Sequence, residues 1–150
     1  MSEERPYKVY KIERGIVIDH IPNKLALNVL KVLGLDKERD SMITMGMNLT
    51  SSKMMTKDVI KIENRELSAE ELNKIAIVAP TATINIIENS AVVRKHKAEL
   101  PKKITGIVKC PNPHCITRNE NVTTIFYPSE SKLKCHYCER SFEREDVELV

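Results

Sequence analysis

CPNPHC, from Cys110 to Cys115, and CHYC, from Cys135 to Cys138, decide the fold of the carboxy-terminal third of this chain. The two close pairs of cysteines are separated by a span that is long enough to form a hairpin. Tetrahedral zinc sites are typically built in this way, because each pair sits on a tight turn and the hairpin brings the turns together. The spacing therefore predicts one structural zinc ion that is held by all four thiolates.

The metal would act as the core of this small region. A domain of about 50 residues buries too little surface to be stable alone, whereas zinc binding contributes apparent folding energy of about 10 to 16 kcal/mol. Four protein ligands leave no open position for a reactive water, so a hydrolytic zinc is not expected. A thioredoxin-like redox pair at Cys135 and Cys138 is the alternative, but no βαβ pattern surrounds these cysteines. His114 and His136 each adjoin a cysteine ligand, which makes a site of three cysteines and one histidine conceivable. Because the set of four cysteines is complete, we interpret both histidines as exposed polar side chains on the zinc turns.

The composition indicates two small cores and an intracellular protein. Of 150 residues 41% are apolar, but there are only two Phe and no Trp, which leaves little aromatic mass for one large core. The formal net charge of +3 is too small to make nucleic acid the default partner. The amino terminus is charged and no apolar run approaches the length of a membrane span, so we expect neither a secretory signal nor a membrane helix. The protein is therefore expected in the cytoplasm, where thiols stay reduced, and four cysteines crowded into residues 110–138 then favour metal ligation over disulfides.

The hydrophobic pattern before Ala98 changes period several times, and each change predicts a new element. Apolar residues of the first element are expected to point inward at Val9, Ile12, Ile16 and Ile18. The elements predicted in order are two extended pieces broken at Gly15 over residues 7–18, a helix over 23–34, strands over 42–49 and 58–63 that form a hairpin, a helix from Ser68 to Pro80, and a closing strand pair over 82–88 and 91–97.

Helix ends are indicated by particular residues. Asn23 is a candidate N-cap of the first helix and Gly34 a candidate stop. Ser68 and Glu71 have the spacing of a capping box, and Pro80 forbids continuation of the second helix.

This order of elements predicts an α+β protein. Strand, helix, strand, strand, helix, strand is the order of a ferredoxin-like βαββαβ sandwich, in which two helices cover one face of one sheet. The polar, proline-bearing stretch over 98–103 then marks a boundary. We therefore expect one domain over residues 1–98 and a small all-β zinc-binding domain over residues 99–150.

Four charged side chains interrupt apolar strands of the first domain. These are Asp19, His20, Lys61 and Lys95. A solvated strand face is the simplest interpretation of each. The sequence contains no glycine-rich phosphate loop, no GxSxG and no HExxH, and no nucleophile has an evident base, so a binding or regulatory role is favoured over catalysis.

Several stretches together resemble one known family, the regulatory chain of aspartate carbamoyltransferase, and the resemblance covers nearly the whole chain. The stretches are RGIVIDHIP (14–22), DVIKIEN (58–64), LNKIAIVAPTATINIIEN (72–89), CPNPHC (110–115) and CHYCE (135–139). The resemblance implies a non-catalytic subunit in pyrimidine biosynthesis, with an amino-terminal allosteric domain that binds CTP or ATP. It also implies that the zinc domain docks the catalytic chain, and that three regulatory dimers, joined through their allosteric domains, bridge two catalytic trimers.

The resemblance further implies roles for particular residues. Asp19 and Lys61 correspond to family positions near the ribose and base of the nucleotide, and His20 and Lys95 to positions on the triphosphate side. Lysine ammonium groups offset triphosphate charge, and a carboxylate accepts hydrogen bonds from ribose hydroxyls. Further positions of the pocket match at Ile12, Val17, Lys57, Val59, Asn85 and Val92. Positions of the partner interface match at Asn112, Tyr137 and Glu139 and, by charge, at Arg140, while His114 stands at an interface position where the family usually has asparagine.

Two other classes of protein stay open at this point. A nucleic-acid-binding zinc ribbon would also have paired cysteines and a basic pI, but it predicts a basic stripe with stacking aromatic residues. The carboxy-terminal third has Lys102, Lys103 and Lys109, but few aromatic residues and interleaved acids. A nucleotide-sensing or amino-acid-sensing domain without a catalytic partner is the other class. Co-purification of the chain with a second subunit would distinguish a regulatory chain from such a domain.

Overall fold

The computed structural model describes residues 12–150, so the extended piece predicted before Ile12, with Val9, lies outside the described residues. The described chain forms two compact units, one that ends at Ala98 and one over Glu99–Val150. The elements are β1 (Gly15–Ile21), α1 (Ala26–Val32), η1 (Leu35–Lys37), β2 (Ile43–Ser51), β3 (Met55–Glu63), α2 (Ala69–Val78), β4 (Thr83–Glu88), β5 (Ala91–Lys97), β6 (Ile104–Thr105), β7 (Val108–Lys109), α3 (Ile116–Asn119), β8 (Ile125–Ser129), β9 (Lys132–Cys135), β10 (Ser141–Glu143), η2 (Arg144–Asp146) and β11 (Glu148–Leu149).

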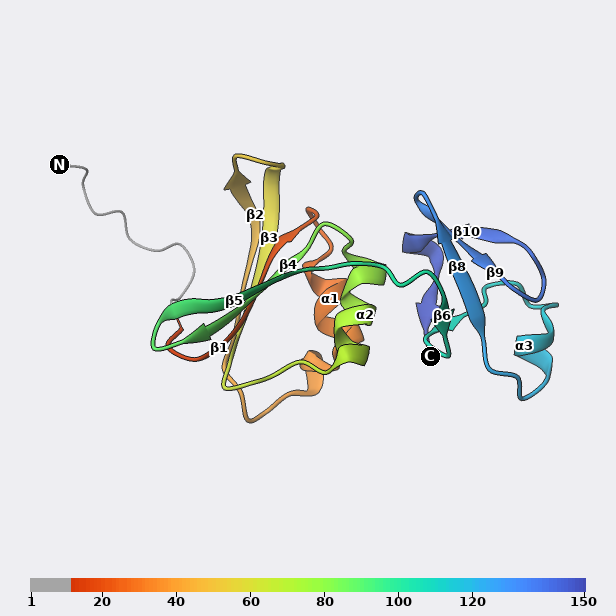
Figure 1. The fold of residues 1–150 in the computed structure, drawn as a ribbon, viewed down its shortest axis with the longest axis horizontal. Coiled ribbons are helices and arrows are strands. Elements are labelled where there is room, and N and C mark those ends of the chain that lie inside the picture. Colours follow the sequence, from red (N-terminus) through yellow and green to blue (C-terminus); the bar gives the residue numbers. More distant parts are fainter. Residues whose placement is uncertain (1–11) are drawn as a thin grey trace. The chain divides into compact units, whose positions relative to one another are not determined.

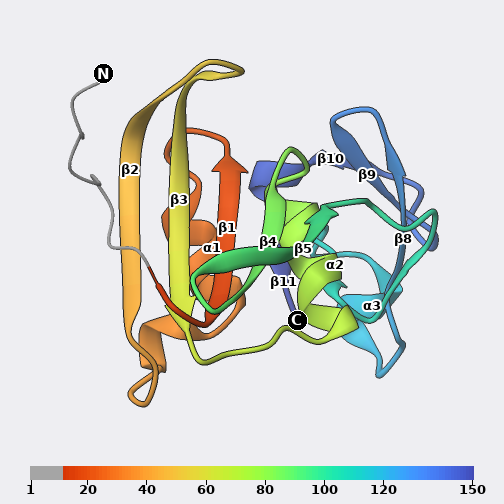
Figure 2. The ribbon, with the colours of Figure 1, turned by 60° about the vertical axis from the view of Figure 1, so that its left-hand side comes forward.

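The first unit is built on a single antiparallel sheet with strand order β2-β3-β1-β4-β5. The order of its first four strands, with a helix after β1 and another after β3, is the ferredoxin-like arrangement that the sequence predicts. β5 extends this sheet by one strand through its hairpin with β4. Figures 1 and 2 show α1 and α2 on the same side of the sheet. The prediction of a mixed α+β fold is confirmed.

Alternation along the central strands separates a buried face from an open one. Isoleucines at every second position form the face under the helices, and they are at most 2% exposed. Burial of such large side chains contributes about 1.5 to 3 kcal/mol each, which makes this layer the main source of stability in the unit. Its members are Ile16, Ile18, Ile60, Ile62 and Ile84.

Three of the four predicted helix signals are confirmed. Ser68 and Glu71 form a reciprocal capping box at the start of α2, and α2 ends before Pro80. Gly34 has a left-handed backbone conformation (φ 69°) just after α1, as a helix stop requires.

The prediction that Asn23 caps α1 is wrong. The helix starts at Ala26, and its N-cap residue, Leu25, makes no side-chain capping bond. The Ala26 N–H instead donates to the carboxylate of Asp58, at 3.2 Å from Oδ2. This acceptor comes from β3, 32 residues along the chain, so local sequence carries no sign of it.

Gly15 begins β1 with φ 144°, where two strands approach closely. A Cβ at this position would lie 2.1 Å from the carbonyl oxygen of Ile62. We expect Gly15→Ala to destabilise the first unit by about 2 kcal/mol or more, because backbone must move to relieve the clash. Gly34→Ala is the matched control, since a Cβ there meets no atom within 4 Å, and it should cost about 1 kcal/mol. Urea unfolding followed by amide exchange in β1 and β4 measures both, and equal losses would contradict the expectation.

The second unit contains two small sheets, with strand orders β10-β9-β8-β6 and β11-β7. Its apolar core is small, consisting mainly of Ile104, Val108, Phe126 and Leu133, each at most 1% exposed. The one-turn helix α3 follows Cys115 directly and has no buried residue, which explains why no helical period predicts it. Across residues 12–150, no helix is both long and apolar enough to cross a membrane.

Candidate metal and nucleotide sites

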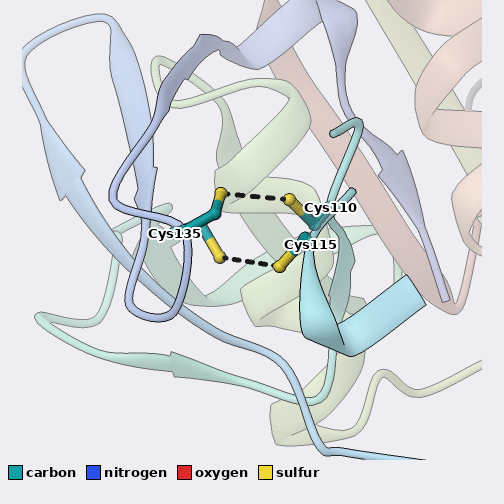
Figure 3. A group of neighbouring side chains, drawn as sticks. Cys110, Cys115 and Cys135 are labelled. Atoms are coloured by element: carbon teal, nitrogen blue, oxygen red, sulfur yellow. Dashed lines mark hydrogen bonds between the residues drawn. The ribbon is translucent and has the colours of Figure 1, made fainter. Parts of the chain in front are cut away.

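All four cysteines converge in the second unit. The Sγ atoms of Cys110 and Cys138 are 3.8 Å apart, as are those of Cys115 and Cys135, and all four sulfurs lie within 4.8 Å of one another. Figure 3 shows Cys110 and Cys115 facing Cys135 across this cluster. Among the described residues it is the only group of histidine, cysteine or acidic side chains with the geometry to hold a metal ion.

The sulfur geometry fits zinc and excludes disulfides. A tetrahedron with Zn–S bonds of about 2.3 Å has edges of about 3.8 Å, which is the separation found in both cross-pairs. A disulfide would require about 2.05 Å, and all four cysteines are free thiols. His114 and His136 are not members of the cluster.

The electrostatics of the cluster also suit a bound cation. Burial opposes ionisation of Cys115, but the Thr117 hydroxyl, which donates to its Sγ at 3.2 Å, and the Thr117 N–H bring the pKa of Cys115 down to about 7. Burial and neighbouring sulfurs raise the pKa values of Cys110 and Cys135. Four thiolates at this spacing repel one another, so full ionisation requires a metal to offset the charge.

The residues predicted to meet a partner lie on or beside the two cysteine turns. His114, Glu139 and Arg140 are exposed. Asn112 differs from them, because it is only 7% exposed and its side-chain oxygen accepts the N–H of His114 at 3.1 Å. Asn112 therefore shapes the first turn from within.

An exposed aromatic group adjoins the second cysteine turn. The ring of His136 makes edge contacts with Tyr127 and Tyr137, with ring centres 5.8 and 5.0 Å away. Both tyrosines keep more than a third of their surface exposed. Aromatic side chains of this kind are enriched at protein interfaces.

Residues predicted to bind nucleotide share the open face of the first sheet. Val17 of β1 is paired with Lys61 of β3 on one side and with Asn85 of β4 on the other, and Asn85 is paired with Lys95 of β5. Directly paired residues point to the same side of a sheet. Lys61, Val17, Asn85 and Lys95 therefore form one row, opposite the face with Ile16 and Ile18.

Asp19 lies two residues along β1 from this row, on the same face. Its carboxylate forms an ion pair with Lys57, whose Nζ is 2.8 Å from Oδ1. Burial raises the pKa of Asp19, but the hydrogen bonds from Lys57 and from the His20 N–H outweigh this effect and lower the pKa overall. Asp19 is therefore a carboxylate at neutral pH.

His20 follows Asp19 and reaches the hydroxyl of Thr83, with Nδ1 3.2 Å from Oγ1. Burial lowers the pKa of His20 and Asp19 opposes this, whereas Lys57, Lys53 and Lys95 lower it further, so the net shift is downward. The imidazole therefore experiences positive charge from two strands, β3 and β5, and from the turn between β2 and β3, and it is largely neutral at pH 7.

Three remaining predicted positions differ in environment. Ile12 and Val59 are buried, at 3% and 5% exposed, whereas Val92, on β5, is 55% exposed. The sequence interpretation missed Thr83 and Lys53. Thr83 precedes Asn85 by two positions on one strand face, so alternation along β4 was a usable signal for it, whereas Lys53 lies in a turn and had none.

The fold and the cysteine cluster define a two-unit protein, in which a ferredoxin-like sheet precedes a small all-β unit with a structural metal site. The model of the aspartate carbamoyltransferase regulatory chain, allosteric domain, matches residues 7–99, and that of the metal binding domain of the same chain matches residues 102–148. The chain therefore belongs to the family of aspartate carbamoyltransferase regulatory chains.

Regulatory chains from three organisms support this family assignment. The regulatory chain from Pyrococcus horikoshii is 51% identical over 144 residues, covering 93% of this chain and 95% of that one. The regulatory chain from Aeromonas salmonicida is 47% identical over 151 residues, covering 98% and 97%. The regulatory chain from Methanococcus maripaludis is 46% identical over 140 residues, covering 91% and 93%. All are named regulatory rather than catalytic chains, and the family favours a regulatory role over a nucleic-acid-binding ribbon or a sensor without an enzyme.

Proposed function

We propose that this chain binds CTP and ATP on the open face of its first sheet and passes the effect to a catalytic chain. The observation that carries the proposal is the row of Lys61, Val17, Asn85 and Lys95, which has the Asp19–Lys57 pair and His20 beside it. Three lysines on β3 and β5 lie around one carboxylate and one neutral imidazole, so the face is cationic overall. A polyanion with a sugar is the ligand that this distribution of charge suits.

Each part of a nucleoside triphosphate finds a complementary group in this arrangement. The ammonium of Lys95 and the ring of His20 would take the triphosphate side. Asp19 would accept hydrogen bonds from ribose hydroxyls, and Lys61 would lie near the ribose and base, with Asn85 between the two lysine-bearing strands. Ile12 and Val92 would complete the apolar surroundings of the base.

Removal of Lys95 tests the proposal. A charge-assisted contact of this kind contributes about 1.5 to 3 kcal/mol, so Lys95→Ala should weaken CTP and ATP binding by more than tenfold in titration calorimetry. Lys61→Ala should weaken binding as well. Lys31→Ala, an exposed lysine in α1, is the control and should bind normally. Wild-type affinity in both test variants would leave these lysines as an ordinary solvated strand face.

The metal of the second unit is zinc in this proposal. The support is the 3.8 Å spacing of the sulfurs and an all-thiolate donor set, which suits a soft, tetrahedral ion. Cys110, Cys115, Cys135 and Cys138 would be its ligands, and its role would be structural. We place the protein in the cytoplasm, where thiols stay reduced.

The second unit would dock the catalytic chain of aspartate carbamoyltransferase. By joining two turns, the metal presents His114, Glu139 and Arg140 on neighbouring loops, with Asn112 supporting the first turn. The exposed aromatic group of Tyr127, His136 and Tyr137 lies beside the second turn and offers apolar contact area.

Two copies of the chain would pair through their first units, and three such dimers would bridge two catalytic trimers. Within residues 12–150, β2 is an edge strand of the sheet; it carries Met45, which is 36% exposed, and Met42 just before it is 55% exposed. An exposed edge with apolar side chains is suited to covering by another chain.

A further inference from the structure

The strand that carries Lys57 and Lys61 has a bulge on each side. Between β1 and β3 the pairing shifts by one residue after Ile18, so that Asp19 and His20 together lie opposite Val59. Between β2 and β3 the pairing shifts after Gly46, so that two β2 residues, the second of which is Asn48, lie opposite Asp58. His20 and Asn48 both have positive φ, at 56° and 59°. Such a conformation is uncommon for residues other than glycine and needs support from the surrounding structure.

One buried carboxylate supports the β2 bulge and the start of α1. Asp58 is 0% exposed. Its Oδ1 accepts the N–H of Asn48 in the β2 bulge at 3.0 Å, and its Oδ2 accepts the N–H of Ala26 in the first turn of α1 at 3.2 Å. A bulge and a helix start both leave backbone N–H groups without ladder or helix partners. Asp58 therefore satisfies one donor of each kind and ties the two segments to β3.

The bulge in β1 changes which side chains reach the open face. Strict alternation from Ile18 would bury position 20 and turn position 21 outward. With one extra residue, Ile21 is buried at 0% exposure, while Asp19 pairs with Lys57 and His20 reaches Thr83. The bulge thus delivers two consecutive polar side chains to the candidate nucleotide site.

Asp58 stands directly behind that site. It neighbours Lys57 in β3, and alternation sends the two side chains to opposite faces. Lys57 meets Asp19 on the open face, whereas Asp58 holds the start of α1, the helix that follows β1, on the buried face. The two ends of the β1-to-α1 segment are thereby fixed from one short piece of β3.

We propose that Asp58 is a positioning residue for the nucleotide site, whose buried carboxylate fixes the β2 bulge and the start of α1 so that Lys57, Asp19 and His20 are held together for the ligand. The proposal rests on the proposed function of the open face. Asp58 makes no contact with the ligand and acts through the Lys57–Asp19 pair.

The variant Asp58→Asn tests this with almost no change in shape. An amide offers one acceptor oxygen where the carboxylate offers two, so one of the two N–H groups loses its partner and faces a second donor. At a temperature where circular dichroism shows the protein folded, ATP and CTP affinities should fall at least fivefold. The pKa of His20, followed by NMR, should rise toward its ordinary value, because burial and the surrounding lysines lower it and both effects weaken when the cluster loosens. Loss of the Asp58 charge alone would lower this pKa further, so a rise reports the movement of the cluster.

A double-mutant cycle separates positioning from plain stability. In a Lys57→Ala background, Asp58→Asn should add less than a twofold loss of affinity, because the pair through which it acts is already gone. Val29→Ala removes buried apolar volume from α1 and is the control for stability alone, with normal nucleotide affinity and a normal His20 pKa. Additive losses in the cycle, or an unchanged affinity and His20 pKa in Asp58→Asn, would overturn the proposal.

A measurement on the wild-type protein covers the case in which Asp58→Asn does not fold. If the bulge and the site are coupled, bound nucleotide must stabilise the Asp58 contacts in return. Amide exchange at Asn48 and Ala26 should then slow more on ATP addition than exchange at Ile75 in α2, and equal slowing would contradict the coupling. If wild-type protein binds neither nucleotide, the proposed function fails by itself, and the His20 pKa in Asp58→Asn still decides whether Asp58 positions this cluster.

Discussion

Removal of the metal by a chelator is expected to unfold the chain from about residue 104 onward and to leave the sheet of β1 to β5 intact. The second unit depends on the metal because its apolar core is small, whereas the first unit has a continuous isoleucine layer. Metal binding supplies about 10 to 16 kcal/mol of apparent folding energy in sites of this type, more than such a core provides. Far-ultraviolet circular dichroism and residue-level amide exchange, before and after chelation, measure the effect in each unit separately.

Single variants sharpen this experiment. Cys138→Ser should reproduce the effect of the chelator, because three thiolates and a hydroxyl bind zinc far less well. Ser131→Ala changes an exposed residue in the same unit and should leave both metal content and exchange rates unchanged. Protection of Phe126 and Leu133 amides that persists in metal-free protein would show that the second unit has a sufficient core without the ion.

Loss of the metal is also expected to abolish binding to the catalytic trimer, since the docking turns exist only while the four cysteines are joined. With zinc present, Arg140→Glu should weaken association by at least tenfold, because it reverses a charge at the proposed contact. Native mass spectrometry or sedimentation of the matched catalytic and regulatory chains measures assembly. Lys102→Glu makes the same change of charge at an exposed site away from the cysteine turns, and it should assemble normally.

The activity of the assembled enzyme provides a second test of docking through the second unit. In the assembled complex, added CTP or ATP should change the dependence of the enzyme on aspartate, because an effector acts only through its different affinities for two conformations. Isolated catalytic trimers should not respond. Intact assembly with metal-free regulatory chain, or no assembly with the zinc-loaded chain, would refute docking through the second unit.

Local chemistry explains which parts of the fold were predictable. Ser68, Glu71 and Pro80 act on residues within one or two turns, so the limits of α2 follow from the sequence. The start of α1 does not, because its capping carboxylate, Asp58, comes from a strand that is distant in sequence. The extension of β1 beyond Ile18 to Ile21 depends on a bulge, which alternation of apolar residues does not reveal.

The two candidate sites differ in the same way. Cysteine spacing alone predicts the cluster, since close pairs on tight turns are sufficient to make it. The row through Lys61, Asn85 and Lys95 requires the register of four strands. In the sequence Lys61 and Lys95 stood out only as charges within apolar strands, and the resemblance to the family was needed to give them a role and to add Asn85. Lys53 became visible only when the structure had placed it near His20, whereas alternation along β4 could have indicated Thr83.

The two units follow one another along the chain without exchanging any segment, and this affects how the protein is made. All strands of the first sheet leave the ribosome before Cys110, and Cys135 and Cys138 emerge later still. Domains generally fold as units during synthesis, with the amino-terminal one first. Under the proposed function, the nascent chain acquires its effector site before it can bind the enzyme, and metal supply then determines how many finished chains become available for assembly.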